Sequence, residues 1–271
     1  MDLGLNGVHV LVTGASGGIG FETTRVYLSL GANVTAHYNT QDSTLRPLLA
    51  EYPDRIQAIQ ANLANESQVV DLFSSAAFQG GFGPVQVAVV NHGIWPSADE
   101  PVVDMSLERW NTTIAANLTS SFLVIREYLK GLKSASLEQK EKAAIVMVGS
   151  TAGKFGEAGH ADYSVTKSGM MYGLTMSLKN EIVKIAPKGR VNTVAPGWVA
   201  TPMAADALKD PQVSYRALAT TPLKKIATPR DIANQIALLS SNFVSGHVSG
   251  QVLMVEGGME GRLLNRPEDL A

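Results

Sequence analysis

The sequence predicts an α/β fold: a doubly wound parallel sheet of about seven strands with helices on both faces. Short apolar runs alternate with segments of helical periodicity along most of the chain. Such runs are typical of strands buried on both faces, and their alternation with helices indicates parallel pairing. The 271 residues suffice for one large domain, and neither a repeat nor a linker divides residues 1–271.

Composition excludes several classes of protein. Hydrophobic residues make up 45% of the chain and the net charge is −2, which argues for a globular protein and against a nucleic-acid surface. The chain has no cysteine, and its five histidines lack metal-binding spacing, so we expect no metal site. Because it has no run of about 18 apolar residues and no secretory signal, we expect no membrane contact and a cytoplasmic location.

Each expected element follows from its local pattern. Apolar runs predict strands at 8–12, 33–38, 55–60, 86–90, 144–148, 190–195 and 251–255. Helical periodicity predicts helices at 19–30, 41–52, 66–78, 106–132, a stretch ending near 186, and 229–240. The remaining long segments are expected to be an exposed loop or frayed helix end at 134–142, a substrate lid at 198–225 and an irregular or partner-bound C-terminal tail at 259–271.

A glycine-rich turn, Thr13-Gly14-Ala15-Ser16-Gly17-Gly18-Ile19-Gly20, joins the first strand to the first helix. Glycines let the backbone approach a pyrophosphate, and a helix N-terminus offers free N–H groups and a partial positive charge. A strand, a glycine turn and a helix in this order are typical of a Rossmann-type dinucleotide site. The alternative is a plain turn rich in small residues.

The end of the second strand bears on the choice of dinucleotide. NAD-binding folds place an acidic residue there against the ribose 2′-hydroxyl. Here the segment reads His37-Tyr38-Asn39-Thr40 and has no carboxylate to repel a 2′-phosphate. Ser16, His37, Asn39 and Thr40 offer donors, so the sequence favours NADP(H) over NAD(H), although no arginine is present. The alternative for His37 is an ordinary surface position.

The segment from Gly149 to Lys167 follows an apolar strand and carries a phenol and an ammonium. Tyr163 and Lys167 are four residues apart, which places both on one helix face. A nearby cation lowers the pKa of a phenol, which can then exchange a proton nearer neutral pH. Ser150, at the strand end, could hydrogen-bond the same substrate oxygen. By itself, Y-x-x-x-K is common by chance and favours the alternative, an ordinary amphipathic helix with a surface lysine.

Several motifs in one order resemble those of the short-chain dehydrogenase/reductase family, in its single-domain branch, over roughly residues 7–258. The glycine turn matches the family's T-G-x-x-x-G-x-G, and Asn91-His92-Gly93 matches its N-A-G with a histidine in place of alanine. Pro196-Gly197 and Thr201 match its P-G-x-x-x-T loop. The family's four catalytic positions are matched by Asn117, Ser150, Tyr163 and Lys167.

The resemblance implies an oxidoreductase that transfers a hydride between NADP(H) and a carbonyl or secondary alcohol. Tyr163 would be the general acid or base, and Lys167 would lower its pKa and bind the nicotinamide ribose. Ser150 would polarise the substrate oxygen, while Asn117 would kink its helix and hold a water of a proton relay. The expected cofactor contacts are Gly14, Ser16, Gly18, Ile19, Gly20, His37, Asn39, Asn62, Leu63, Asn91, Gly93, Arg126, Tyr163, Lys167, Pro196, Gly197, Val199 and Thr201.

The substrate itself is not specified by any residue of the sequence. Asn62 stands where the family usually has an aspartate against adenine. Candidate substrate contacts suit a fairly apolar molecule, although each could equally be a packing residue: His92, Trp95, Phe155, His160, Trp198 and Met203. The family commonly forms tetramers through the helices that carry Asn117 and Tyr163, so we expect a homo-oligomer, a tetramer or a dimer.

Three other functions stay open at this point. The chain could be a cofactor-binding regulator without turnover, although all four catalytic positions are intact. It could be a nucleotide-sugar epimerase or dehydratase, but those chains are generally longer and have a separate substrate domain. It could also use the same pocket for a non-redox, cyclase-like step.

Overall fold

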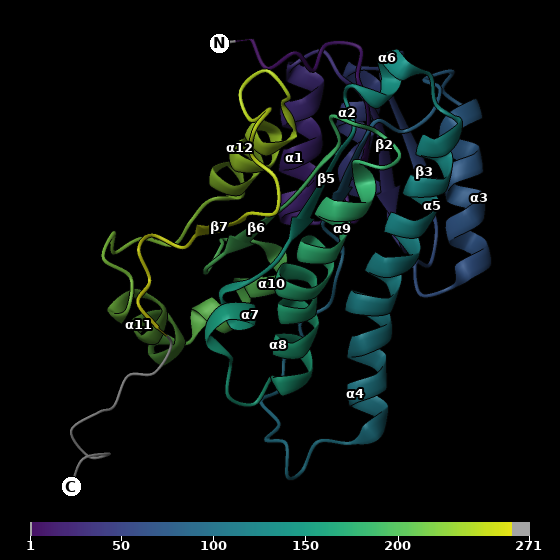
Figure 1. Cartoon of the computed structure of the whole chain (residues 1–271). Coiled ribbons are helices and arrows are strands. Elements are labelled where there is room, and N and C mark those ends of the chain that lie inside the picture. Colours follow the sequence, from purple (N-terminus) through teal and green to yellow (C-terminus); the bar gives the residue numbers. More distant parts are fainter. Residues whose placement is uncertain (1, 262–271) are drawn as a thin grey trace, which may run out of the picture.

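The fold is built around a wholly parallel sheet of seven strands, as the sequence predicted. A computed structural model describes residues 2–261, and its strand order is β3-β2-β1-β4-β5-β6-β7 (Figure 1). The order reverses between β1 and β4, which makes their carboxyl ends the expected place for a ligand. The strands are β1 (His9–Val12), β2 (Asn33–Tyr38), β3 (Ile56–Gln60), β4 (Val87–Val90), β5 (Ala144–Val148), β6 (Arg190–Pro196) and β7 (Val252–Val255).

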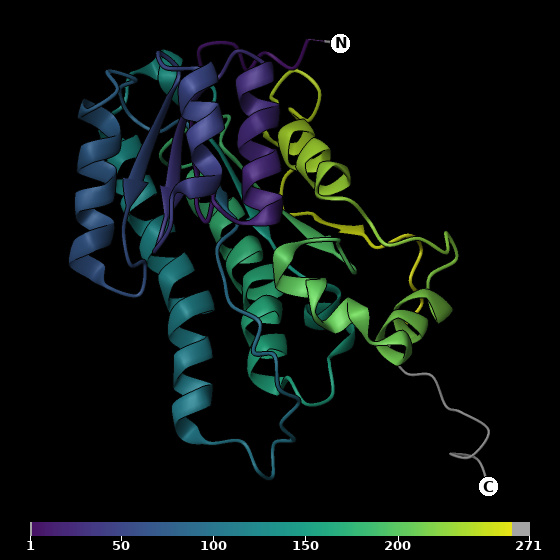
Figure 2. The same ribbon diagram turned by 180° about the vertical axis from the view of Figure 1, so that it is seen from behind.

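Helices cover both faces of the sheet. One face packs against α1 (Gly18–Ser29), α2 (Arg46–Glu51) and α12 (Pro229–Ser240), and the other against α3 (Glu66–Phe78), α5 (Ser120–Ser134) and α9 (Thr175–Ile182) (Figures 1 and 2). The other helical segments are η1 (Ser43–Leu45), α4 (Leu107–Thr113), η2 (Ile114–Thr119), α6 (Leu137–Lys140), α7 (Thr151–Phe155), α8 (Ala161–Ser168), η3 (Gly169–Leu174), α10 (Pro202–Ala205), η4 (Ala207–Lys209) and α11 (Pro211–Ala219).

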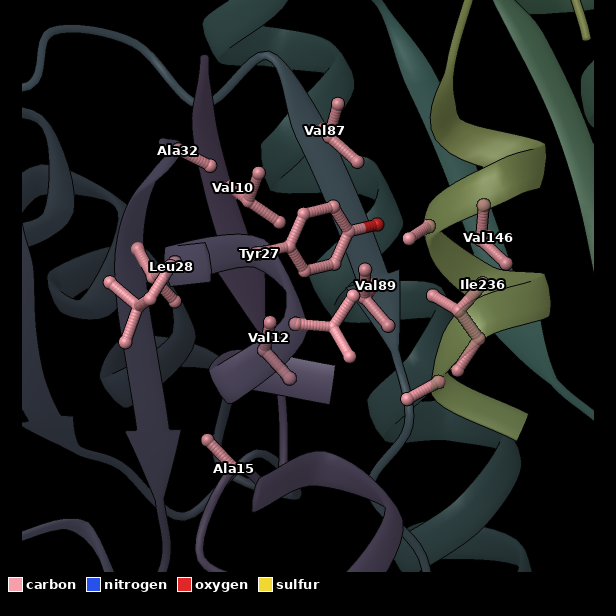
Figure 3. Close-up of a cluster of buried hydrophobic side chains, with 14 of the residues drawn as sticks. Val10, Val12, Ala15, Tyr27, Leu28, Ala32, Val87, Val89, Val146 and Ile236 are labelled. Atoms are coloured by element: carbon pink, nitrogen blue, oxygen red, sulfur yellow. The ribbon is translucent and has the colours of Figure 1, made fainter. Parts of the chain in front are cut away.

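Side chains that alternate along the strands divide the core into two layers. In β1, Val10 and Val12 face the α1–α12 layer, and Leu11 faces the opposite layer. The Tyr27 ring lies among β1 and β4 valines, and Ile236 of α12 points into the same cluster (Figure 3). Both residues are fully buried, so α1 and α12 are held against the sheet largely by apolar packing.

Three helical predictions needed correction. The stretch predicted to end near 186 contains a π-helical segment, η3, and its last helix, α9, ends at Ile182. The helix predicted at 106–132 starts at its Ser106 cap but contains a π-helical turn, η2, before it continues as α5. The segment 134–142 holds a short helix, α6, because Ser136 and Gln139 cap each other's backbone N–H groups. The S-x-x-Q pattern of this capping box was present in the sequence.

The segment after β6 forms α10, η4 and α11, in keeping with the short helical fragments expected there. Its role as a lid stays a prediction. Of the C-terminal tail predicted at 259–271, residues 262–271 lie outside the described part of the chain. Within residues 2–261, no helix combines the length and the apolar character that crossing a membrane requires.

The packing of α12 against the sheet predicts a large cost for truncating Ile236. Ile236→Ala should lower the free energy of unfolding by about 2–5 kcal/mol, because it leaves a cavity among Tyr27 and the β-strand valines. The measurement is urea denaturation. Leu137→Ala is the control: its side chain is 80% exposed, so a change within about 0.5 kcal/mol is expected. Equal losses in the two variants would contradict this account of the core.

Candidate active site

A cavity of about 430 Å³ lies at the carboxyl ends of the strands. Its walls come from the turns after β1 to β6 and from the start of α10, so segments distant in sequence meet there. One part is lined by the glycine turn and by residues that follow β2 and β3. The other is lined by Ser150, Tyr163 and Lys167 together with two indoles, Trp95 and Trp198.

The glycine turn after β1 has the geometry that a bound pyrophosphate requires. Gly14 has φ +63, and a Cβ on Gly20 would lie 2.1 Å from the Gly14 carbonyl oxygen. Asn91 donates from Nδ2 to the carbonyls of Thr13 and Gly14, at 3.0 and 3.2 Å, and so braces the turn from β4. The residues present therefore fit a dinucleotide whose phosphates face the N-terminus of α1.

The His37 ring is hydrogen-bonded to the backbone of this turn and is not available as a donor in the cavity. Its Nδ1 accepts from Gly14 N at 3.0 Å, and Nε2 bonds to the Ala61 carbonyl at 2.9 Å. Burial lowers the pKa of His37 to about 4, so the ring is neutral at pH 7. This corrects its expected role: His37 lines the cavity, but both ring nitrogens already serve the fold, which leaves Ser16, Asn39 and Thr40 as donors toward a 2′-phosphate.

His92 is likewise held at both ring nitrogens. Nδ1 lies 2.8 Å from Thr13 Oγ1, and Nε2 lies 2.7 Å from Ser120 Oγ. Burial holds the pKa of His92 well below its usual range. The ring ties the β1 and β4 ends to α5, and its contact with substrate stays a prediction.

Lys167 places a buried ammonium beside Tyr163. Its side chain is almost fully buried, its Nζ lies 5.7 Å from the centroid of the Tyr163 ring, and it donates to the Val148 carbonyl at 2.9 Å. Burial lowers the pKa of Lys167 to about 8. An ammonium has three N–H bonds, so two remain for groups in the cavity that Lys167 lines.

Asn117 sits in the π-helical turn and stands behind the cavity wall. Its Oδ1 accepts from Ile94 N at 2.7 Å, and its Nδ2 donates to the Ile94 carbonyl at 2.9 Å. A Cβ on Gly93 would lie 3.1 Å from Asn117 Oδ1 and 3.6 Å from Lys167 Nζ. The glycine therefore allows amide and ammonium to approach the same backbone segment. The predicted water relay through Asn117 stays a prediction.

Ser150 begins α7 directly after β5. Its Oγ accepts from Ala152 N at 3.1 Å, which is the N-cap contact of that short helix. A hydroxyl that accepts one bond keeps its own hydrogen to donate. Ser150 and Tyr163 both line the cavity.

Most residues proposed from sequence line this one cavity. They are Gly14, Ser16, Gly18, Ile19, His37, Asn39, Asn62, Leu63, Asn91, His92, Gly93, Trp95, Ser150, Tyr163, Lys167, Pro196, Gly197, Trp198, Val199, Thr201 and Met203. Gly20 and Asn117 lie directly behind the lining and shape it.

Three further residues that were expected to contact cofactor or substrate do not line the cavity. Arg126 instead pairs with Glu66 at 2.6 Å and Glu127 at 2.9 Å on the outer side of α5. Phe155 lies at the end of α7, where Lys154 covers its ring. His160 is buried behind Trp95. Sequence position alone could not reveal which side of its helix or loop each of these residues faces.

Sequence reasoning missed Glu157, which lines the cavity, and the pair Arg109–Asp162 behind it. Asp162 is fully buried and directly precedes Tyr163, but nothing in the sequence marks it as paired with a residue of another helix. Among residues 2–261 no group of three or more histidine or acidic side chains is placed to hold a metal ion.

Comparison with known proteins identifies the family. A family model described as "Enoyl-(Acyl carrier protein) reductase" matches residues 14–260. The chain belongs to the short-chain dehydrogenase/reductase family. It is therefore a member of an oxidoreductase family whose members bind a nicotinamide cofactor and act on small molecules.

Relatives span nearly the whole chain. Nodulation protein G of Rhizobium sp. (strain N33) is 34% identical over 94% of this chain and 98% of its own length. A 3-oxoacyl-(acyl-carrier-protein) reductase of Vibrio cholerae is 33% identical over 95% and 99%. A solved short-chain dehydrogenase/reductase structure from Brucella melitensis, described as a glucose/ribitol dehydrogenase, superimposes with TM-score 0.83, 32% identity and coverage of 95% and 98%.

The buried Lys167 ammonium is predicted to lower the stability of the folded protein. Lowering the Lys167 pKa from 10.5 to about 8 means that burying the charge costs about 3 kcal/mol at pH 7. Lys167→Met should therefore raise the free energy of unfolding by about 1–3 kcal/mol at pH 7, measured by urea denaturation without cofactor.

The pH dependence gives the sign of this effect. Between pH 8 and 10.5 the unfolded wild-type chain binds more protons at Lys167 than the folded chain, so wild-type stability gains from this group as pH rises. The advantage of Lys167→Met should shrink over that window. Lys184→Met, on the exposed end of the same helical region, is the control for loss of a positive charge. A stability difference between Lys167→Met and wild type that does not change with pH would contradict the assignment.

Proposed function

We propose that this chain is a cytoplasmic NADP(H)-dependent oxidoreductase that transfers a hydride between the cofactor and a carbonyl or secondary alcohol. The observation that carries the proposal is the buried Lys167 ammonium beside Tyr163, with the Ser150 hydroxyl on the same cavity. The glycine turn and Asn91 supply the cofactor end of that cavity. The similarity to proteins described as 3-oxoacyl-(acyl-carrier-protein) reductases and as a dehydrogenase supports carbonyl and alcohol chemistry.

The bound nicotinamide supplies or accepts the hydride. Ser150 donates its free hydroxyl hydrogen to the substrate oxygen and stabilises the negative charge that develops there. Tyr163 transfers its hydroxyl proton to the same oxygen in carbonyl reduction, and takes that proton in alcohol oxidation. The Lys167 ammonium stabilises the phenolate that forms. The Val148 carbonyl accepts from the ammonium, and Asn117 holds the loop after β4, whose Gly93 leaves room for the ammonium.

Exposed apolar side chains support a homo-oligomer. Phe122 of α5, Val165 of α8 and Tyr172 of η3 are each 45–47% exposed, and they lie on the long helices that carry Asn117 and Tyr163. Because these exposed side chains are largely apolar, their burial against another copy of the chain would be favourable.

Replacing the phenol tests the mechanism. Tyr163→Phe removes the transferable proton but keeps the ring, so kcat should fall by about a thousandfold or more. The assay follows NADPH absorbance with the most reactive member of a carbonyl panel. NADPH affinity, measured by fluorescence, should change less than about twofold. Tyr172→Phe is the matched control because Tyr172 does not line the cavity. Activity within tenfold of wild type in Tyr163→Phe would refute the mechanism.

The cofactor preference rests on the carboxyl end of β2. Because Asn39 places no negative charge beside a 2′-phosphate, NADPH should bind at least about tenfold tighter than NADH in fluorescence titrations. Asn39→Asp should weaken NADPH binding by about tenfold or more through charge repulsion and leave NADH binding within a fewfold. Asn65→Asp, at the exposed cap of α3, is the charge-matched control. Equal or tighter binding of NADH by the wild type would overturn the preference.

A further inference from the structure

Two indoles form the outer wall of the substrate end of the cavity. Trp95 follows β4 and Trp198 follows β6, and both line the cavity. Their ring centroids lie 6.2 Å apart at an interplanar angle of 79°. Ile94 and Met203 line the same cavity, and so does Glu157. The cavity that Tyr163 and Ser150 line therefore carries several apolar and aromatic side chains.

The Trp95 indole is backed by a second ring. His160 stacks on it with centroids 4.8 Å apart and an interplanar angle of 12°. His160 is 1% exposed, does not line the cavity, and bonds through Nε2 to the Pro96 carbonyl at 2.7 Å. The imidazole therefore fixes the plane of Trp95 from behind, and another part of the indole faces the cavity.

One guanidinium joins the Trp95 loop to the helix that carries Tyr163. Arg109 of α4 donates to the Ala98 carbonyl at 2.8 Å and to Glu100 Oε2 at 3.0 Å on the loop side. On the other side it donates to the Gly159 carbonyl at 3.0 Å and to Asp162 Oδ2 at 3.2 Å. Only 13% of the Arg109 side chain is exposed, so these contacts are weakly screened.

Further contacts tie the same two segments together. Glu100 N donates to the Gly159 carbonyl at 2.9 Å. Gly159 has φ +79, and a Cβ there would lie 2.9 Å from the Asp99 side chain. Thr113 Oγ1 adds a 2.7 Å bond to Asp162 Oδ2, next to Tyr163. The loop after β4 and the first turn of α8 are thus held as one unit.

We propose that Trp95 is a specificity-determining residue that selects carbonyl compounds with a flat ring system next to the carbonyl, and that Arg109 is a positioning residue that acts through it. The inference rests on the proposed carbonyl reduction and narrows its substrate class. A planar apolar group packs on an aromatic side chain at low entropic cost when the ring is already fixed in place. Here His160 stacks on the Trp95 ring, and Arg109 holds the loop that follows Trp95. A flexible alkyl chain of similar size gains less from the same surface.

The test compares two ketones, one flat and bicyclic (2-tetralone) and one linear (2-octanone). The wild type should show a higher kcat/KM for 2-tetralone. Trp95→Ala should lower that value about tenfold, mainly through KM, and change the value for 2-octanone less than about twofold. Trp95→Phe should restore part of the preference. Trp110→Ala, which removes an indole outside the cavity, should leave the ratio unchanged.

A binding measurement separates this inference from the proposed function. Calorimetry with 2-naphthol, a flat compound that is not reduced, should show binding to the wild type with NADP⁺ present and about tenfold weaker binding to Trp95→Ala. An equal or inverted ketone ratio in the wild type, or 2-naphthol binding unaffected by Trp95→Ala, would overturn the inference. Carbonyl reduction that still depends on Tyr163 would then leave the proposed function standing, whereas no turnover with any carbonyl would refute that function.

Arg109→Lys tests the positioning role, because one ammonium cannot serve all four acceptors of the guanidinium. The KM for 2-tetralone should rise several-fold, with kcat and the 2-octanone values nearly unchanged. In the Trp95→Ala background the same change should have no further effect on the ratio of the two ketones, since Arg109 acts through Trp95. Additive effects on that ratio would contradict the coupling, and an equal loss with both ketones would indicate a merely structural role.

Discussion

A positive charge held out of water is the constraint on which the site depends. Lys167 is almost fully buried, and the desolvation that lowers its pKa to about 8 would ordinarily push an ammonium to the surface. The fold retains it by offering the Val148 carbonyl at the end of β5 and by leaving room at Gly93. The charge is thereby placed near Tyr163, where it costs stability and would favour the proton transfer that we propose.

The Lys167 ammonium lies near an irregular helical turn and a loop. The helix α4–α5 contains a π-helical turn at Asn117, whose amide bonds both backbone groups of Ile94. Such turns are frequent at functional sites because they free or redirect polar groups. The next residue after Ile94 is Trp95, so the segment that borders the ammonium also leads into the aromatic wall. One short loop therefore joins the proposed site of proton transfer to the proposed substrate wall.

Buried polar residues outside the chemistry hold the same edge of the sheet together. His37 and His92 are kept neutral by burial and join the glycine turn to β2, β4 and α5 through both ring nitrogens. Arg109 and Asp162 join the loop after β4 to the start of α8. His37 and His92 bond through both ring nitrogens, and Arg109 donates to four acceptors, whereas Asp162 accepts through Oδ2 only. These contacts hold the cavity walls relative to one another.

The sequence by itself determined the alternation of strands and helices, the glycine turn and the residues brought to the carboxyl edge. These follow from local periodicity and from a rule of parallel sheets, so they need no knowledge of contacts. Only the tertiary structure decided where side chains such as Arg126 and His160 point, because an arginine that pairs with Glu66 and a histidine that backs Trp95 look in sequence like cavity residues. Only the tertiary structure shows that Arg109 and Asp162 form an ion pair. These residues are 53 positions apart on different helices, and they meet because the helices pack together.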